Sequence, residues 1–381
     1  MTGKITADFI ARFGEQPIVF RSPGRINILG EHTDYNEGFV LPAAIDKRIY
    51  VAINKRADDQ VNLYAADFNE GFTTDTENIK PASLQWPNYI LGVVDQLQKH
   101  GHTIGGFNLL IDGDIPIGAG LSSSAAVECV VIYALNEIFA LGLSRMQMAP
   151  LAQKAEHVFA GVNCGIMDQF ASLFGKKDHA IKLDCRSMEY EYVPVKHEGY
   201  KIILFNSNVN HNLASSEYNT RRSQCESGIA MIKQFHPAVK NLRDVTMNML
   251  HDHVEPADGL IYKRCRYVVE ENERVLAACE DLKKGDIKAL GSKMYETHQG
   301  LRFDYEVSCK EIDFLVDYVR ANEDVAGARM VGGGFGGCTI NFIKDQAVEK
   351  ITADISRDYK KETGLTLTAY EVSIEDGAGP A

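Results

Sequence analysis

The chain has 381 residues, of which 45% are hydrophobic and 24% charged, and its formal net charge at pH 7 is -12. This composition is that of an ordinary soluble protein, and the length predicts two domains because it exceeds the usual size of a single core. An acidic surface repels nucleic acid and anionic membranes, so neither is expected as a partner and any phosphate has to be bound by local groups.

The 8 cysteines are scattered singly, without a C-x-x-C pair or a cluster with histidine. Reduced thiols and a cytoplasmic location are therefore expected. Near the N-terminus, Ile5, Phe9, Ile10 and Phe13 recur at helical spacing among polar residues, which predicts a short helix rather than a signal peptide. No apolar run reaches the length of a membrane span.

A strand predicted over residues 17–23 leads into residues 24–36, which are unusually rich in hydrogen-bonding side chains. These are Arg25, Asn27, Glu31, His32 and Asp34. Sugar hydroxyls both donate and accept hydrogen bonds, so such a mixture suits a polyol. An ordinary turn is the alternative interpretation, because turns also collect Gly, Asn and Asp.

Further strands are predicted over residues 49–53, 61–64 and 107–111, and a helix begins near Trp86 with an apolar face. Trp86 is the only tryptophan of the chain. We expect it to be a packed boundary residue, with stacking on an adenine ring as the less favoured alternative.

Residues 116–126 form a loop with two glycines and three serines, followed by a helix predicted to continue to about Leu141. Glycines let the backbone approach a ligand, and the serines are expected to cap the helix. Amides at a helix N-terminus, aided by the helix dipole, bind phosphate. The loop lacks the lysine of a Walker motif, and a glycine turn before a core helix is the alternative.

Two carboxylates follow on later helices. Glu156 lies on the helix expected after Ser144, where the pattern alone favours a solvated carboxylate over a ligand of the serine loop. Asp168 lies among apolar residues and needs a partner. An ion pair with Arg25 would hold this carboxylate ionised and oriented, and an interaction with the helix N-terminus is the alternative.

A hairpin is predicted over residues 180–193, and we place the domain boundary near His197, which gives domains of residues 1–197 and 198–381. The second half is expected to be mainly helical through Tyr318, with Tyr218 directed back into the cleft. Arg221 and Arg222 are expected to be surface charges or structural partners.

Residues 332–337 contain G-x-G-x-x-G, but a strand-like segment follows instead of the helix that a dinucleotide site requires. A strand, a glycine turn and a returning strand would instead pack closely on the loops of the first domain.

Three motifs, in this order, resemble those of one family. Residues 24–35 resemble the galactokinase signature, residues 118–126 the phosphate loop of the GHMP kinases, and residues 332–337 the third motif of that superfamily. The similarity also includes residues 164–169 and 216–222. The first motif is specific to galactokinases and close sugar kinases, whereas the other two mark only the superfamily.

The resemblance implies a two-domain α/β (α+β) fold with the active site in the cleft between the domains. It also implies ATP-dependent phosphorylation of α-D-galactose at the C1 hydroxyl, the first committed step of galactose breakdown by the Leloir route. ATP would be the co-substrate and Mg²⁺ the cofactor.

Carried over residue by residue, the resemblance makes Asp168 the catalytic carboxylate and Arg25 its partner. The residues around the sugar would be Glu31, His32, Asp34, Gly165 and Tyr218. Those around the phosphates would be Gly118, Ala119, Gly120, Leu121, Ser122, Ser123 and Ser124. Ser124 and Glu156 would hold magnesium.

Two other functions stay open. A kinase for another galacto-configured sugar, such as N-acetylgalactosamine or L-arabinose, is the nearer alternative, although Thr33 and Asn36 favour plain galactose. A non-catalytic galactose sensor is less favoured, because such sensors have a damaged serine loop and residues 122–126 are intact here. A monomer is expected.

Overall fold

The computed structural model describes residues 1–116, 118–209 and 214–381, without the side chains of residues 214–216. Ile117 of the predicted phosphate loop therefore lies outside the described residues, as do the side chains of Ser215 and Ser216. Helices and strands alternate along the described chain, in agreement with the mixed α and β class predicted from the sequence. Within these residues, no helix is both long and apolar enough to cross a membrane.

The first half is built on a 6-stranded sheet in the order β13-β1-β3-β6-β4-β5. Its strands are β1 (Ile18–Asn27), β3 (Pro42–Lys55), β4 (Gln60–Ala65), β5 (Glu70–Asp75), β6 (Phe107–Gly113) and β13 (Gly379–Pro380). The strand pairs are antiparallel apart from β4 and β6, which are joined through the helical connection that parallel pairing requires.

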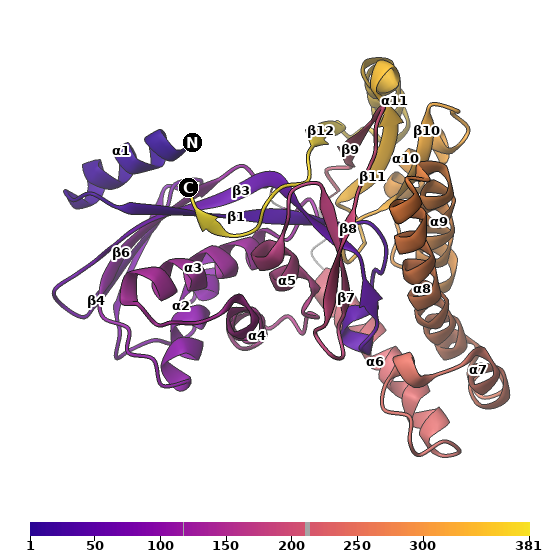
Figure 1. Ribbon diagram of the computed structural model, residues 1–381, viewed down its shortest axis with the longest axis horizontal. Helices are drawn as coiled ribbons and strands as arrows, with labels where there is room; N and C mark the ends of the chain where they lie inside the picture. Colours follow the sequence, from indigo (N-terminus) through magenta and orange to yellow (C-terminus); the bar gives the residue numbers. More distant parts are fainter. Residues whose placement is uncertain (117, 210–213) are drawn as a thin grey trace.

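Helices cover both faces of this sheet (Figure 1). On one face lies α1 (Thr2–Phe13), whose Ile5 and Phe9 pack on Ala52 and Leu110. The other face carries α2 (Gln85–Lys99), α3 (Ser123–Phe139), α4 (Arg145–Ala155) and α5 (Met167–Phe174). Because side chains alternate along a strand, the odd-numbered residues of β3 from Ile49 to Ile53 point into this larger core.

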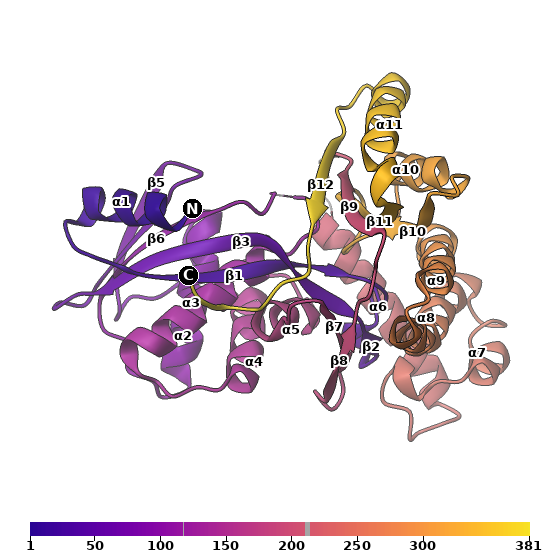
Figure 2. The ribbon, with the colours of Figure 1, turned by 45° about the horizontal axis from the view of Figure 1, so that its top comes forward.

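The second half contains a 4-stranded sheet in the order β10-β11-β9-β12. Its strands are β9 (Tyr200–Asn206), β10 (Val325–Met330), β11 (Cys338–Lys344) and β12 (Thr368–Val372). The helices around it are α6 (Ala214–Lys233), α7 (Met247–His253), α8 (Gly259–Lys284), α9 (Ile287–Gln299), α10 (Lys310–Arg320) and α11 (Val348–Thr363). Figure 2 shows this sheet standing across the end of the first one.

A small sheet lies between the halves. It consists of β2 (Phe39–Val40), β7 (His179–Asp184) and β8 (Tyr190–Pro194), so the predicted hairpin is confirmed. The remaining helical turns are short. They are the 3₁₀ turns η1 (Asp34–Asn36), η3 (Leu242–Asp244) and η5 (Asp345–Ala347), and the π-helical turns η2 (Glu156–Ala160) and η4 (Gly300–Asp304).

The C-terminus returns to the first half of the molecule, as both ribbon views show. Gly379 and Pro380 pair with β1, and the carbonyl of Ala378 accepts a hydrogen bond of 2.7 Å from Arg145. The domain boundary near His197 stays a prediction. With that division, the last residues of the chain would belong to the second domain, although they pair with the sheet of the first.

Two predicted element ends differ from the structure. The helix expected to reach Leu141 ends at Phe139, because Ala140 adopts a left-handed conformation that closes the last turn. The strand expected to end at Pro23 continues through Asn27, because a register shift between Pro23 and Arg25 accommodates the proline within the sheet.

Gly291 provides a test of the packing between α9 and β10. A Cβ added at Gly291 would lie 1.8 Å from the carbonyl oxygen of Ala326, and this backbone cannot move aside without shifting the strand. We expect Gly291→Ala to lower the free energy of unfolding by about 2 kcal/mol through overpacking, measured by urea unfolding. Gly3→Ala is the matched control, since nothing lies within 4 Å of that position. Equal stability of both variants would contradict the assigned packing.

Candidate active site

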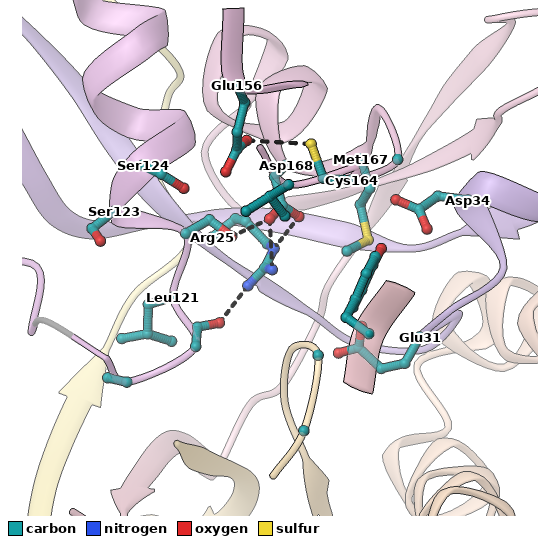
Figure 3. A pocket seen from close by; sticks show the side chains of 18 of the residues that line it. Arg25, Glu31, Asp34, Leu121, Ser123, Ser124, Glu156, Cys164, Met167 and Asp168 are labelled. Carbon is teal, nitrogen blue, oxygen red and sulfur yellow. Dashed lines mark hydrogen bonds and ion pairs between the residues drawn. The ribbon is translucent and has the colours of Figure 1, made fainter. Parts of the chain in front are cut away.

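A cavity of about 360 Å³ lies where the loops of the first half meet the glycine-rich turn and α6 of the second half. All the site residues predicted from the sequence line it. They are Arg25, Glu31, His32, Asp34, Gly118, Ala119, Gly120, Leu121, Ser122, Ser123, Ser124, Glu156, Gly165, Asp168 and Tyr218. Figure 3 shows side chains from these separate segments converging on one space.

The serine loop approaches the start of α3 through three residues of positive φ, namely Gly118 (73°), Gly120 (75°) and Ser122 (59°). Ser122 occupies the N-cap position, but its side chain makes no capping hydrogen bond. The expectation that a serine caps α3 is wrong, because the left-handed backbone of Ser122 directs its hydroxyl to Asp168 instead. The first amides of α3 therefore remain available to an anion.

The glycines of the third motif pack against this loop, as predicted. A Cβ at Gly332 would lie 2.9 Å from the carbonyl oxygen of Gly120, and one at Gly337 would lie 3.1 Å from that of Ala119. Both glycines also have positive φ, of 84° and 79°. Strand β11 follows the motif, so a dinucleotide-binding turn into a helix is excluded.

Arg25 and Asp168 form a two-pronged ion pair in the cavity, drawn with dashed lines in Figure 3. Arg25 Nε donates to Asp168 Oδ1 at 2.8 Å, and a terminal nitrogen donates to Oδ2 at 3.0 Å. The other terminal nitrogen donates to the carbonyl of Gly120 at 2.6 Å. The ion pair weighed from the sequence is therefore present, and Asp168 also lies in the first turn of α5, where the helix dipole favours a carboxylate.

The polar loop after β1 is buried over most of its length. Glu31 Oε1 accepts hydrogen bonds from Arg329 at 2.9 Å and from the amide of Gly332 at 2.8 Å. His32 adopts a left-handed backbone conformation (φ 64°). Residues other than glycine rarely adopt this conformation, and those that do cluster at functional sites.

Burial controls the charge state of two residues of this loop. Burial, aided by the negative charge of Asp168, raises the pKa of Asp34 to about 7. Burial lowers the pKa of His32 to about 4, so its imidazole is neutral at physiological pH. His32 lines the cavity, and its Nε2 atom is buried without a hydrogen-bond partner among the described residues.

Gly165 and Tyr218 complete this end of the cavity. A Cβ at Gly165 would lie 1.9 Å from Asp34 Oδ2, so only glycine fits beside that carboxylate. The Tyr218 ring lies 5.4 Å from the ring of His32 and 5.3 Å from that of Tyr35. Tyr218 thus points into the cleft as expected, whereas Arg221 is a structural partner that donates to the carbonyls of Tyr305 and Glu306.

Glu156 begins the π-helical turn η2 and is only 7% exposed, so the solvated carboxylate favoured by the sequence pattern is wrong. Its side chain hydrogen-bonds with Ser124 and accepts from Gln169 at 2.8 Å. Burial and the charge of Asp168 raise the pKa of Glu156. Gln169 also donates to the fully buried Glu128 at 3.0 Å. The sequence reasoning missed this acidic neighbour.

A bound cation would relieve the charge at Glu156, and the adjacent Ser124 hydroxyl is a suitable second ligand. The described residues contain no group of three or more His, Cys, Asp or Glu side chains arranged to hold a metal. This donor set fits Mg²⁺, which proteins bind through one or two side chains plus substrate phosphates and water rather than through a complete cage.

Two buried charged residues that support the loop were also missed. Arg329 is fully buried in β10 and holds Glu31, while Glu271 of α8 accepts a 2.7 Å hydrogen bond from the amide of Gly30. The sequence did contain a signal for Arg329, because it is a lone arginine in the apolar run of β10, just before the glycine motif. A buried guanidinium needs partners, although the sequence does not name them.

The comparisons with known proteins agree with this geometry. The galactokinase galactose-binding signature matches residues 7–55, the GHMP kinase N-terminal domain residues 88–176 and the GHMP kinase C-terminal domain residues 278–361. A galactokinase from Thermotoga petrophila is 44% identical over 357 residues, which cover 94% of this chain and 98% of that protein. The chain belongs to the galactokinase family. It is thus a sugar kinase, a phosphotransferase, as the sequence predicted.

Other members of the galactokinase family extend the similarity. A galactokinase from Roseiflexus is 40% identical over 379 residues, or 99% of this chain and 97% of its own length. The structure of Lactococcus lactis galactokinase complexed with galactose superposes with a TM-score of 0.96 at 34% identity, covering 100% of both chains. Methanococcus jannaschii mevalonate kinase, at 16% identity and a TM-score of 0.64, shares the fold. The predicted GHMP kinase fold is confirmed.

Asp34 gives a pH-dependent prediction. With its pKa at about 7 in the folded chain, Asp34 keeps a proton that the unfolded chain releases near pH 4, so stability falls as the pH rises between these values. We expect Asp34→Asn to remove this loss. In the absence of sugar, the melting temperature of the variant minus that of the parent should therefore increase as the pH is raised from about 5 to about 8. Asp252→Asn, an exposed position on α7, is the control, and a pH-independent difference for Asp34→Asn would contradict the assignment.

Proposed function

We propose that this chain transfers the γ-phosphoryl group of ATP to the C1 hydroxyl of α-D-galactose, giving galactose 1-phosphate and ADP. The observation that carries the proposal is the Arg25–Asp168 pair, which joins a sugar-binding loop to a phosphate loop in one cavity. Its likeness to the galactose-complexed Lactococcus lactis enzyme supports galactose as the sugar.

On the sugar side, Asp34 and Glu31 would accept hydrogen bonds from hydroxyls, and the unpartnered Nε2 of His32 would bind another. Tyr218 would cover a face of the sugar ring, and the backbone at Gly165 would lie against it. A sugar that lacks a matching hydroxyl would leave one of these carboxylates buried and unpaired, which costs more than losing a methylene contact. These side chains would therefore discriminate between sugars by the configuration of their hydroxyls.

On the nucleotide side, the uncapped amides of α3 and the loop of residues 118–124 would bind the phosphates. A second cavity of about 240 Å³ shares Ser123 and Ser124 with the first. It is lined by aromatic and aliphatic side chains together with a few polar ones, namely Phe68, Trp86, Tyr89, Ile49, Ala65, Ile111, Ile115, Val127, Asp67, Gln85 and Asp112. Its aromatic side chains and its polar groups suit an adenine ring, which supports the less favoured role weighed for Trp86. Trp86 is held there by a 2.8 Å hydrogen bond to Glu70.

Mg²⁺ would be held by Ser124 and Glu156 together with ATP, and when bound it supplies positive charge to the phosphate oxygens. Among the described residues that line the cavity, Arg25 is the only cationic side chain. This chain therefore needs the cation and the α3 amides to offset the charge of the phosphates.

In the transfer, the bond from the C1 oxygen to the γ-phosphorus forms while the bond from that phosphorus to ADP breaks, and ADP leaves with the electron pair. Asp168 would accept the C1 hydroxyl proton. Arg25 bonds both oxygens of the carboxylate and Ser122 bonds Oδ2, which orients the group, and Oδ1 would keep a lone pair for the hydroxyl. Cytoplasmic location and a monomeric state remain predictions, and the intact serine loop disfavours the sensor.

Asp168→Asn tests the proton acceptor. The amide keeps the shape of the carboxylate but cannot take the proton, so turnover should fall by on the order of 10²–10⁴-fold with saturating ATP, magnesium and galactose. Galactose binding, measured by calorimetry, should persist. Turnover within a few-fold of the parent in a folded variant would leave Asp168 only a positioning role.

Parallel ATP-consumption assays with galactose, N-acetylgalactosamine and L-arabinose identify the preferred sugar.

Ser124→Ala and Glu156→Gln test the metal side. Both should reduce kcat/KM for magnesium ATP by about tenfold or more, because an assigned ligand is lost or weakened. Galactose affinity should stay within about twofold, since both residues are assigned to the phosphate side of the cavity. Glu137→Gln, an exposed position on α3, is the control for Glu156→Gln. Loss of galactose binding with ATP use intact would overturn the assignment.

A further inference from the structure

The segment that carries Gly165 is held by two side chains that the function proposed above does not use. The Cys164 carbonyl accepts a hydrogen bond of 2.8 Å from Nε2 of His157 and one of 3.1 Å from Nε2 of Gln153. His157 belongs to η2 and Gln153 to α4. A carbonyl oxygen has two lone pairs and cannot donate, so both side chains are donors and the carbonyl is saturated.

These two donors line a third cavity, which lies beside the active-site cavity. The third cavity has a volume of about 500 Å³, and Asp34, Cys164 and Gly165 line it together with Gln153 and His157. The same three residues also line the active-site cavity, whereas Gln153 and His157 are not among the described residues that do so. The Cys164–Gly165 peptide therefore lies between the two cavities, with its carbonyl directed to the third.

The direction of the Cys164 carbonyl fixes that of the next amide. A trans peptide is planar, with its N–H antiparallel to its C=O, and no described peptide bond is cis. The amide hydrogen of Gly165 therefore points away from the third cavity. Gly165 is buried, yet its amide donates no hydrogen bond to any residue that the structure describes. Buried amides nearly always have a partner, so this one is available to a ligand.

From this geometry we propose that His157 and Gln153 are positioning residues for the sugar. By holding the Cys164 carbonyl, they aim the amide of Gly165 at a sugar oxygen. The inference rests on the function proposed above, which places Gly165 against the sugar. A Cβ at Gly165 would lie 1.9 Å from Asp34 Oδ2, so the amide and the carboxylate are close neighbours. One hydroxyl can then donate to ionised Asp34 and accept from Gly165.

Two donors suit this task because a glycine gives the peptide little conformational preference of its own. A flip of the peptide would turn the amide hydrogen away and present the Cys164 carbonyl beside the carboxylate of Asp34. Such a flip has to break both hydrogen bonds to the carbonyl at once. The second half of the molecule holds the preceding peptide, since Arg222 of α6 donates to the carbonyl of Asn163 at 3.0 Å.

The sequence allows this one peptide to be observed alone, because Cys164–Gly165 is the only Cys-Gly pair of the chain. Protein labelled with ¹³C at the cysteine carbonyls and ¹⁵N at glycine gives a single signal in an NMR experiment that correlates each amide with the preceding carbonyl. We expect the Gly165 amide proton to shift downfield when galactose is added. No shift in the parent at saturating galactose overturns the proposal, whether or not any variant folds.

His157→Phe and Gln153→Met each remove one donor while keeping the approximate size of the side chain. We expect the Cys164 carbonyl signal to move upfield and the galactose Kd, measured by calorimetry, to be about 5–10-fold higher. The kcat should stay within about threefold, because Arg25 and Asp168 keep their contacts. His157→Gln, whose amide nitrogen reaches about as far as Nε2, should recover most of the affinity.

A series of deoxygalactoses, each lacking one hydroxyl, tests the contact itself. In the parent, the analogue without the hydroxyl that Gly165 contacts should bind more weakly than galactose. In His157→Phe and Gln153→Met, this difference should shrink for that analogue alone. His197→Phe is the matched control, because the His197 ring also bonds a backbone carbonyl, that of Tyr200 at 2.7 Å, and lines neither cavity among the described residues.

Unchanged galactose affinity in both variants would overturn the proposal. A higher KM for magnesium ATP with galactose affinity intact would also overturn it, because the two residues would then act on the neighbouring Glu156. An equal loss of affinity in His197→Phe would show a general effect. Calorimetry on the parent separates these failures from failure of the proposed function. If the parent does not bind galactose, the sugar assignment fails, and if it binds and phosphorylates galactose with the Gly165 signal unmoved, only this inference fails.

Discussion

The structure depends most on Arg329, a guanidinium in β10 that is completely buried. It donates to the carbonyls of Asn27, Ile28 and Met330 and to the carboxylate of Glu31. A buried charge is tolerated only when its hydrogen bonds are satisfied, and here backbone that would otherwise lack partners satisfies them. This contact sets the glycine motif of the second half against the polar loop of the first, so the cavity between them exists only when both halves are in register.

Helix α8 supports the same loop from the other side. Glu271 accepts from the amide of Gly30, Asn272 accepts from that of Phe39 at 2.8 Å, and the Tyr267 hydroxyl donates to the carbonyl of Glu31 at 3.0 Å. A loop bonded at so many backbone positions can keep His32 in a left-handed conformation that would be unfavourable in a free chain. The sugar end of the cavity is thus preorganised, which limits the ordering cost of binding.

The phosphate end is organised differently. The amides that begin α3 lack a side-chain cap, and several carboxylates, including Glu128, Glu156 and Asp168, lie close together beneath them. Burial and mutual repulsion raise the pKa values of the two glutamates, so this end holds unfavourable charge that a cation and its nucleotide would relieve. The backbone of the sugar end is fixed before binding, whereas the charges at the phosphate end are balanced only when ligands bind.

The sequence alone determined those features of the protein that depend on residues close together in the chain. Apolar periodicity predicted most of the helices and strands, and glycine spacing located the loop at residues 118–124 and the turn at residues 332–337. Motif resemblance named candidates that line one cavity. Only the tertiary structure decided that Ser122 bonds Asp168 instead of capping α3, that Glu156 is buried, and that Arg329 and Tyr305 reach the loop after β1. These contacts join residues up to about 300 positions apart, and burial, which shifts the pKa of Asp34 and His32, is a property of the packed chain rather than of any local pattern.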